Sequence, residues 1–390
     1  MTFDEIIDRR GAHTAKWDAM EAFAGVSPDG GLPMWVADME FRPPQVALDA
    51  AQRLIELGSF GYFGDDTAYR ESIRSWQEAR HGVTIDPAHI CTTHGLVNAI
   101  GVILDEFTAP GDGVVVFSPV YHAFGRIVRA AGRELIECEM GIGPDGTYAL
   151  DLERYAAQLP SHAKVLIFCT PHNPAGRLWR REEIEAVAAF ARAHDLLLIS
   201  DEIHQDLVLP GSKHIPTALI EGVEDRLITL AAASKTFNIA GAHTGQAIIA
   251  DDALRARFTA RLGALGLSPN SIGLHMTTAA YSPAGAEWVD ALCAYLAGNV
   301  DVFAEGIKAI PGLTMMPMEA TYLAWVNTEG TGMTADEVKA RVNGTARIAP
   351  SPGPDFGKGG AGWLRFNLAM PRAQIEEAVS RLQEAFADLQ

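Results

Sequence analysis

The feature that most constrains the fold is a regular alternation of short apolar runs and helical patterns between about residues 90 and 250. The apolar runs lie at 114–117, 165–169, 196–199, 227–231 and 246–250, and the helical patterns include 97–107, 120–131 and 182–193. Strands that alternate with helices in this way form a mostly parallel sheet with helices on both faces. Ligands of such sheets bind at the carboxyl ends of the strands. We therefore predict an α/β fold with its site in the loops that follow these runs.

The flanking regions predict a second, smaller α+β domain. The chain over 30–41 has an extended pattern, and a helix begins at Pro44 and ends at Gly58. Beyond Pro269 we expect a helix over 281–302, a strand over 322–326, a helix over 335–342, a loop over 349–362, a strand over 363–368 and a helix from Pro371. The predicted divisions are an N-terminal segment over 1–45 that packs with the small domain, a large domain over 46–283 and a small domain over 284–390.

The charge and the cysteines exclude several classes of function. The formal net charge is −18, from 31 basic and 49 acidic residues, whereas nucleic acids and anionic membranes need a basic surface. The four cysteines are widely spaced and form no C-x-x-C motif, so neither a disulfide framework nor a zinc site is indicated. No window approaches the roughly 18 apolar residues of a membrane helix, and no signal peptide is visible. We expect a cytoplasmic protein.

Lys235 follows the apolar run 227–233 and precedes a Gly/Ala-rich turn. A lysine at the end of a buried strand has a costly charge unless it is paired or its pKa falls. A lysine that stays neutral there is a nucleophilic amine of the kind that forms Schiff bases. The alternative is an ordinary surface lysine, and three other stretches decide between the two.

Two of these stretches suit an anionic ligand. Gly95 precedes a helical pattern, where free N–H groups and a close backbone approach favour a phosphate. Asn173 stands between two prolines and is followed by Gly176, a loop that presents its side-chain amide. An amide can donate to a phenolate oxygen and keep it ionised. Taken alone, each pattern could equally be an ordinary turn.

The third stretch places Asp201 directly after the run 196–199. A carboxylate in this position must be paired to stay charged, and a protonated pyridine nitrogen would be a suitable partner. The alternative role is a helix N-cap. Glu202 and His204 lie nearby, but no H-E-x-x-H motif or matching cluster is present, and we assign no metal.

Arg365 interrupts an alternating strand pattern that should bury one face. A guanidinium in that setting can bind a carboxylate through two hydrogen bonds. The alternative is a surface arginine on an edge strand. The Gly-rich loop over 353–359 is not a phosphate-binding P-loop, because Pro352 replaces the first glycine and Gly359 replaces the Ser/Thr.

Together these residues supply what pyridoxal 5'-phosphate (PLP) requires. Their order, Gly95, Tyr121, Asn173, Asp201, Lys235 and Arg365, resembles that of fold-type I PLP enzymes of the class I/II aminotransferase superfamily. A closer resemblance is to the MalY/PatB-like C–S lyases, the cystathionine β-lyases. It rests on FD at 3–4, DRR at 8–10, KWD at 16–18, MWVADM at 34–39, FGY at 60–62, SPVY at 118–121, PHNP at 171–174, SDEIH at 200–204, ASKTFN at 233–238 and ATYLAW at 320–325.

The resemblance implies a homodimer with shared active sites and a role for each matching residue. Lys235 would bind PLP as a Schiff base, Asp201 would pair with the pyridinium, and Asn173 would meet the ring oxygen. Tyr121 would stack on the ring, and Arg365 would hold the substrate carboxylate. The phosphate would be bound at Gly95, Leu96, Val97 and Ser234, with Tyr62 of the other subunit, and the substrate pocket would include Asn173, Trp35, Tyr62 and Tyr322.

Two positions depart from the superfamily pattern. Thr170 replaces an asparagine that often precedes the proline, and His243 stands where many aminotransferases have a phosphate-binding arginine. The role of His243 is therefore open.

The implied activity is β-elimination from L-cystathionine or another L-cysteine S-conjugate, which gives a thiol, pyruvate and ammonia. Lys235 would remove the Cα proton. Two alternatives remain, an aminotransferase that uses the same residues and a regulatory protein that binds PLP. The sequence does not identify the preferred sulfur substrate.

Overall fold

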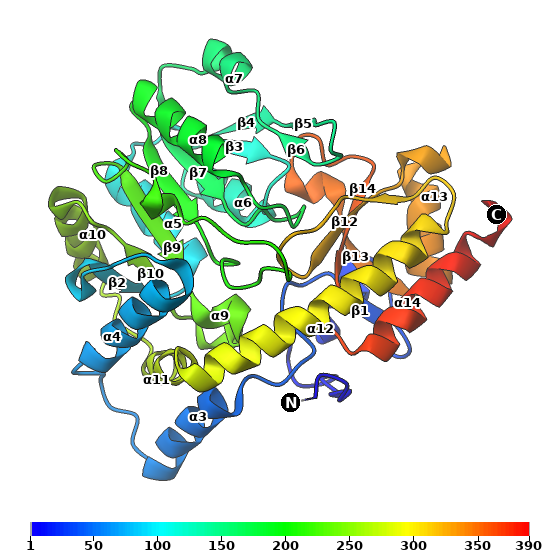
Figure 1. Cartoon of the computed structure of the whole chain (residues 1–390), viewed down its shortest axis with the longest axis horizontal. Helices are drawn as coiled ribbons and strands as arrows, with labels where there is room; N and C mark the ends of the chain where they lie inside the picture. The colour runs from blue at the N-terminus through cyan, green and yellow to red at the C-terminus, as the bar shows by residue number, and fades with distance from the viewer. Residues whose placement is uncertain (1, 390) are drawn as a thin grey trace.

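The computed structural model describes residues 2–389 and contains two large sheets (Figure 1). The larger sheet has the strand order β2-β10-β9-β8-β7-β3-β4. Neighbouring strands are parallel except at β10, which is antiparallel to both β9 and β2. The strands are β2 (Ile90–Thr93), β3 (Gly113–Ser118), β4 (Glu134–Glu139), β7 (Ala163–Cys169), β8 (Leu197–Asp201), β9 (Leu227–Ala231) and β10 (Gly245–Ile248). The predicted α/β fold with a mostly parallel sheet is confirmed.

The central strands form because both of their faces are buried by helices. Alternate residues of β3 belong to different apolar clusters, Val115 to one and Val114 and Val116 to the other. The first cluster includes residues of α8 (Arg181–Ala193), and the second includes residues of α5 (Leu96–Phe107), α6 (His122–Ala130) and α10 (Asp252–Ala264). A continuous run of β-branched residues is the pattern expected for such a doubly covered strand.

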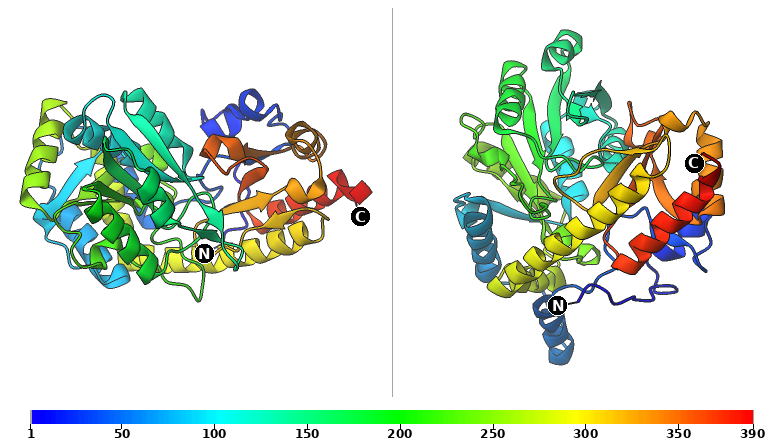
Figure 2. Two further views of the ribbon diagram at one scale, coloured as in Figure 1. Left: turned by 90° about the horizontal axis from the view of Figure 1, so that it is seen from above. Right: turned by 45° about the vertical axis from the view of Figure 1, so that its right-hand side comes forward.

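The second sheet has the order β1-β13-β14-β12-β11. Its strands are β1 (Leu32–Met34), β13 (Ile348–Pro352), β14 (Trp363–Asn367), β12 (Leu323–Asn327) and β11 (Thr314–Met315). Only β1 and β13 pair in parallel. The N-terminal segment thus completes a sheet built from the C-terminal part of the chain, and Figure 2 shows α1 (Ala15–Asp18) and α2 (Met20–Ala24) beside this sheet.

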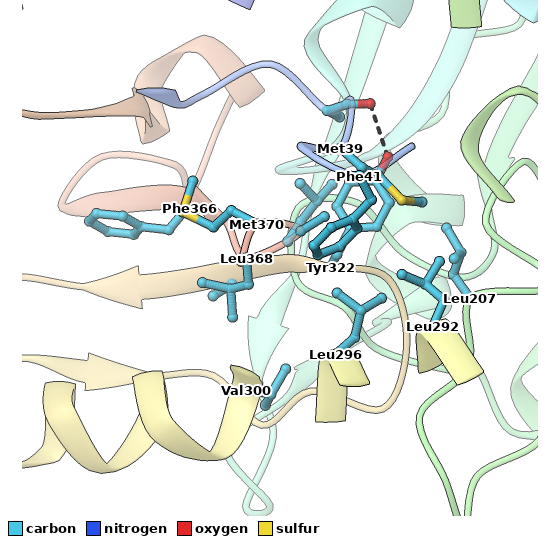
Figure 3. Close-up of a cluster of buried hydrophobic side chains, with 14 of the residues drawn as sticks. Met39, Phe41, Leu207, Leu292, Leu296, Val300, Tyr322, Phe366, Leu368 and Met370 are labelled. Atoms are coloured by element: carbon cyan, nitrogen blue, oxygen red, sulfur yellow. Dashed lines mark hydrogen bonds between the residues drawn. The ribbon is translucent and has the colours of Figure 1, made fainter. Parts of the chain in front are cut away.

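Two long helices join this sheet to the rest of the molecule. Helix α12 (Pro283–Lys308) runs from the large sheet to the small one, next to α14 (Arg372–Ala385) (Figure 1). Apolar residues of α12 pack with residues of the N-terminal segment, β12 and β14 in one cluster (Figure 3), which includes Met39, Phe41, Leu292, Leu296, Tyr322, Phe366 and Leu368. The cluster holds the N-terminal segment between the two sheets.

Helix α3 (Gln45–Leu57) and the loop after it project from the body of the chain. The helix ends at Gly58, which has a φ of +67°, a conformation that glycine adopts without strain. Large side chains here are exposed, and Tyr62 is fully accessible. The remaining helices and strands are α4 (Thr67–Trp76), β5 (Gly141–Ile142), β6 (Tyr148–Ala149), α7 (Leu152–Gln158), α9 (Ala233–Thr236), α11 (Ser271–Ala280) and α13 (Ala335–Lys339).

The structure corrects three sequence predictions. The first part of the expected loop over 349–362 is strand β13, because its backbone pairs with both β1 and β14. The helix expected over 281–302 begins at Pro283 and continues to Lys308, and the helix expected over 335–342 is α-helical only to Lys339. The domain divisions at 45 and 283 stay a prediction. Within residues 2–389, no helix is both long and apolar enough to cross a membrane.

Candidate active site

The strand order of the large sheet brings four predicted site residues to one edge. Tyr121 follows β3, Asn173 follows β7, Asp201 is the last residue of β8, and Lys235 follows β9. The strands β3, β7, β8 and β9 are successive neighbours and all parallel. Their carboxyl ends therefore lie side by side. Lys235 belongs to the short helix α9 rather than to the loop that the sequence suggested.

Lys235 is partly buried, and its amine faces the backbone of the N-terminal segment. The Lys235 Nζ donates a hydrogen bond of 2.5 Å to the carbonyl oxygen of Ala37. Burial lowers the pKa of Lys235 to about 8, because the charged form loses water. Asp38 and Asp201 oppose this effect, whereas Arg365 adds to it. The amine is therefore neutral in a sizeable fraction of molecules near neutral pH, as a nucleophile or a general base requires.

Asp201 is buried, with 5% of its surface exposed. Its Oδ1 accepts a hydrogen bond of 3.2 Å from the amide of Ile203. Burial, helped by the charge of the neighbouring Glu202 and opposed by the Ile203 amide and Lys235, raises the pKa of Asp201 to about 7. Glu202 is itself engaged by Ser200, Thr217 and His214. A buried carboxylate of this kind is suited to a cationic ligand group, which would restore its ordinary ionisation.

Arg365 lies in the middle of β14 with only 2% of its surface exposed, so the surface alternative is wrong. Its guanidinium donates to Asn173 Oδ1 at 3.0 Å, to the carbonyl of Trp35 at 2.7 Å and to Ser351 Oγ at 3.2 Å. All three acceptors are neutral, and the buried Nε has no hydrogen-bond partner. Burial lowers the pKa of Arg365 to about 10. A buried cation with neutral partners and a free donor suits an incoming carboxylate.

The contact with Arg365 also fixes how Asn173 presents its amide. Because Asn173 Oδ1 accepts from Arg365, the amide nitrogen of Asn173 is left to donate elsewhere. Asn173 is 4% exposed, so its orientation is held by its surroundings. The two residues are 192 positions apart in the chain. They connect the large sheet with the small one at the site.

The N-terminus of α5 has the form of an anion site. Gly95 is its N-cap with a φ of +86°, and no side chain caps the helix. A Cβ at Gly95 would meet no atom within 4 Å, so the space above it is open. The amides of Leu96 and Val97 are the first of the twelve-residue helix and have no intrahelical acceptor. Such a terminus suits a phosphate.

Of the other predicted residues, Tyr121 and Trp35 lie near Arg365, whereas Tyr62 does not lie at the site of its own chain. Tyr121 lies next to α6, and burial raises its pKa, which Arg365 lowers and Asp201 raises. The Trp35 indole stacks on Phe23 with a centroid distance of 4.1 Å, while its carbonyl contacts Arg365. Tyr62 is exposed on the projecting loop, so a single chain does not bring it to the site.

Sequence reasoning missed two groups at the site. The Ala37 carbonyl accepts from Lys235 and, at 3.0 Å, from the Tyr322 hydroxyl. Since a carbonyl belongs to every residue, no sequence signal marks it. His204 is buried, with an unpartnered Nδ1, and burial lowers its pKa to about 3, with Lys235 and Arg365 adding to the effect. Its place after Asp201 was visible, but only as a metal ligand to be rejected.

The donor set fits PLP. The Lys235 amine suits its aldehyde, the Asp201 carboxylate its pyridine nitrogen, and the Asn173 amide its ring oxygen. The N-terminus of α5 and Ser234 suit its phosphate. The unpartnered Nε of Arg365 remains for the carboxylate of an amino acid.

Comparisons with known proteins agree with this geometry. The family model "Aminotransferase class I and II" matches residues 35–382. Cystathionine beta-lyase PatB of Bacillus subtilis is 36% identical, over 99% of this chain and 100% of its own length. The structure of cystalysin from Treponema denticola, which contains a PLP cofactor, has a TM-score of 0.94 and 32% identity, covering 100% of this chain and 99% of its own. The PLP-bound C–S lyase from Staphylococcus hominis has a TM-score of 0.90 and 28% identity, covering 99% and 98%. The chain belongs to the aminotransferase class I and II family.

Proposed function

We propose that this protein is a PLP-dependent C–S β-lyase, which cleaves L-cystathionine or another L-cysteine S-conjugate to a thiol, pyruvate and ammonia. The observation that most supports this is the placement of a buried Arg365, with only neutral acceptors, close enough to Lys235 to act on its charge, while Lys235 is in turn close enough to Asp201 to act on the charge of that carboxylate. This set is suited to an amino acid with a free carboxylate. The relatives named as lyases favour elimination from sulfur substrates over transamination.

The substrate is oriented by Arg365. Its free Nε donates to the α-carboxylate, which adds a negative partner to the neutral ones. Asn173 keeps the guanidinium in place through its Oδ1. Burial strengthens this ion pair, because little water competes for either charge. Arg365 of β14 holds the carboxylate of the substrate, and the amino group is directed to the edge of the large sheet. The Cα–H bond is then presented to Lys235.

Lys235 acts as the general base. With a pKa of about 8 its amine is neutral often enough to accept the Cα proton near neutral pH. The Ala37 carbonyl, which already accepts from Nζ, can hold the resulting ammonium. The chemistry that PLP supplies when bound is an electron sink for the negative charge left at Cα. Asp201 serves that sink by keeping the pyridine nitrogen protonated, and Tyr121 by packing on the ring.

The enzyme acts as a homodimer in this proposal. The end of α3 and the loop after it expose Ile55, Leu57, Phe60 and Tyr62, a group of apolar side chains that a second copy would cover. Tyr62 would then reach the phosphate of the partner's site. The four cysteines are buried and unbonded, as in proteins of a reducing compartment, which supports a cytoplasmic location.

The deciding experiment is a pyruvate assay on the purified holoenzyme with L-cystathionine and no added keto acid. We expect pyruvate and free thiol in equal amounts over many turnovers. An aminotransferase would stop after one turnover, because it needs a keto acid to regenerate its cofactor. Conversion of the cofactor to its amine form without pyruvate would overturn the lyase proposal for that substrate.

A further inference from the structure

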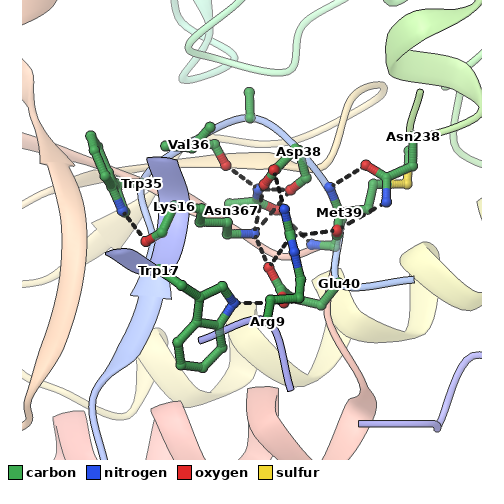
Figure 4. Close-up of polar contacts among 12 residues, drawn as sticks. Arg9, Lys16, Trp17, Trp35, Val36, Asp38, Met39, Glu40, Asn238 and Asn367 are labelled. Atoms are coloured by element: carbon green, nitrogen blue, oxygen red, sulfur yellow. Dashed lines mark hydrogen bonds and ion pairs between the residues drawn. The ribbon is translucent and has the colours of Figure 1, made fainter. Parts of the chain in front are cut away.

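The 35–39 segment lies next to Lys235 and is held in an unusual way. It follows β1 but belongs to no sheet, and each of its five carbonyls accepts a hydrogen bond from a side chain. Figure 4 shows these bonds at residues 36, 38 and 39. The donors are Arg365 and Ser351 to residue 35, Asn367 to residue 36, Lys235 and Tyr322 to residue 37, Lys16 and Asn367 to residue 38, and Arg9 and Asn238 to residue 39. Side chains from both ends of the chain, together with Lys235 and Asn238, therefore fix this backbone.

Helix α9, which contains Lys235, and the residues directly after it are joined to the segment at two points. The Asn238 side chain accepts from the amide of Met39 at 2.9 Å and donates to its carbonyl at 3.0 Å. Three residues earlier, Lys235 donates to the carbonyl of Ala37. Asn238 has a φ of +55°, a conformation that asparagine tolerates better than most residues. Any displacement of the segment would therefore move the acceptor of the Lys235 amine.

A partly buried charge cluster lies on the other side of the segment. It consists of Arg9, Lys16, Asp38 and Glu40, two cations and two anions (Figure 4). Arg9 contacts Asp38 at 2.7 Å and Glu40 at 2.9 Å, and Lys16 contacts Glu40 at 2.9 Å and Asp38 at 3.5 Å. Lys16 has no exposed surface and Glu40 is 3% exposed, whereas the side chains of Arg9 and Asp38 are 18% and 20% exposed. Buried charges are costly unless they are paired, so the pairing of Lys16 and Glu40 favours one arrangement of the segment.

The two carboxylates of the cluster differ in their relation to Lys235. Asp38 directly follows Ala37, and its buried Oδ1 has no hydrogen-bond donor in the structure. Its charge acts on Lys235, whereas that of Glu40 is not among the charges that do. Glu40 is occupied by Lys16, Arg9 and the indole of Trp17. Asp38 is therefore the carboxylate of the cluster that lies next in the chain to the acceptor of the Lys235 amine.

We propose that Asp38 is a positioning residue for Lys235. Asp38 holds the Ala37 carbonyl, and its own negative charge, at the place where the protonated Lys235 amine rests when that amine is not joined to the cofactor. The Tyr322 hydroxyl completes this resting place through its bond to the same carbonyl. This inference rests on the proposed function, because it assumes that Lys235 is the residue that leaves the cofactor and gains the substrate proton. It assigns a role to Lys16 of the KWD motif and to Asp38 of the MWVADM motif, which the mechanism above does not use.

The charged groups that act on Lys235 predict whether each substitution should raise or lower its pKa. Asp38 and Asp201 favour its protonated form, and Arg365 and Lys16 disfavour it. Replacing Asp38 by asparagine should lower the pKa of Lys235. Replacing Lys16 by methionine, which leaves both carboxylates paired with Arg9, should raise it. Glu40→Gln is the control, since it removes the other carboxylate of the same cluster, which is more buried than Asp38.

The experiment is competitive acetylation of the full chain freed of cofactor. Acetic anhydride is the probe, and peptide mass spectrometry follows the labelling of Lys235 from about pH 6 to about pH 10, a range that spans the displaced and ordinary lysine values. We expect Asp38→Asn to lower the midpoint by about one pH unit, the lower end of the effect of a close opposite charge. Lys16→Met should raise it, and Glu40→Gln should leave it within a few tenths of the wild-type value.

A purely structural role for Asp38 predicts a different result. Asp38→Asn and Glu40→Gln would then reduce the melting temperature alike and would give the same midpoint for the labelling of Lys235. This outcome overturns the proposal. If Asp38→Asn does not fold, an unchanged midpoint in folded Lys16→Met overturns it in the same way. The labelling does not depend on turnover, so failure of the pyruvate assay would remove the proposed function without altering this result.

Discussion

The edge of the large sheet and the 35–39 segment meet at Lys235, but they are positioned by different means. Tyr121, Asn173, Asp201 and Lys235 owe their places to the ends of parallel strands, whose register is set by backbone pairing and buried apolar faces. The 35–39 segment has no strand partner, and side chains distant in sequence fix its carbonyls. One half of the site is therefore built by regular structure and the other by individual polar contacts. Substitutions should affect the two halves differently.

The largest effect is expected for Lys235→Ala, which removes the residue shared by both halves. Loss of the amine should reduce turnover by about 10⁴-fold or more, because nucleophile and general base disappear together. Cofactor absorbance and pyruvate formation would both be measured. Lys164→Ala, which removes an exposed lysine of β7, is the control and should retain both. Normal turnover in Lys235→Ala would show that the general base is another residue.

Arg365→Met should weaken substrate binding by about 10- to 100-fold, as expected for the loss of hydrogen bonds to a charged group. The effect should appear in the KM for L-cystathionine more than in kcat. Arg126→Met changes an exposed arginine near Tyr121 and serves as the charge control. An unchanged KM in Arg365→Met would place the carboxylate site away from β14, and the small sheet would then contribute no substrate contact.

Asn238→Ala tests the half of the site that lacks regular structure. It removes one acceptor and two donations to the backbone of residues 39 and 41, and leaves the Met39 amide without its partner. We expect the free energy of unfolding to fall by about 1–3 kcal/mol, measured by urea titration. Asn238→Asp keeps the acceptor but turns a carboxylate oxygen toward the carbonyls of residues 39 and 41, and should be no more stable than Asn238→Ala. A cost no greater than that of a surface substitution would contradict our view of how the segment is held.

The last effect concerns the sheet edge alone and depends on pH. Burial raises the pKa of Asp201 from 3.8 to about 7, so between these values the folded cofactor-free chain holds a proton that the unfolded chain has released. The free energy of unfolding contributed by this group should fall by about 1.4 kcal/mol for each pH unit across that window. It is fully present below 3.8 and lost above about 7. Asp201→Asn cannot ionise, and its urea unfolding should lack this part of the slope.

The same contrast explains what could be predicted from the sequence. The central strands were visible because burial on both faces gives unbroken apolar runs, and their ends located Asn173, Asp201 and Lys235. Strand β4 was not visible, because it contains Glu134, Glu137 and Glu139 and is only partly buried. The expected loop over 349–362 concealed β13 for a related reason, since its two prolines suggest a loop whereas its pairing with β1 depends on a segment more than 300 positions away.

Contacts between side chains and distant backbone were beyond sequence reasoning. Nothing in the sequence around Arg365 indicates that the carbonyl of Trp35 and the amide oxygen of Asn173 would be its partners. The motif residues Lys16 and Asp38 could be recognised as shared with a family, but their contact follows only from the folded chain.

The acceptor of the Lys235 amine is a main-chain oxygen, and this limits how the site can be altered. No substitution at Ala37 removes its carbonyl, so a systematic replacement of side chains would never identify this atom directly. It would instead detect the residues around it, as a set of weak and scattered effects at positions 9, 16, 38, 238, 322 and 367. Natural variation faces the same restriction: apart from Asp201 and Arg365, which also act on the lysine, its basicity can be adjusted only through those neighbours, whose changes must keep two cations and two anions in balance.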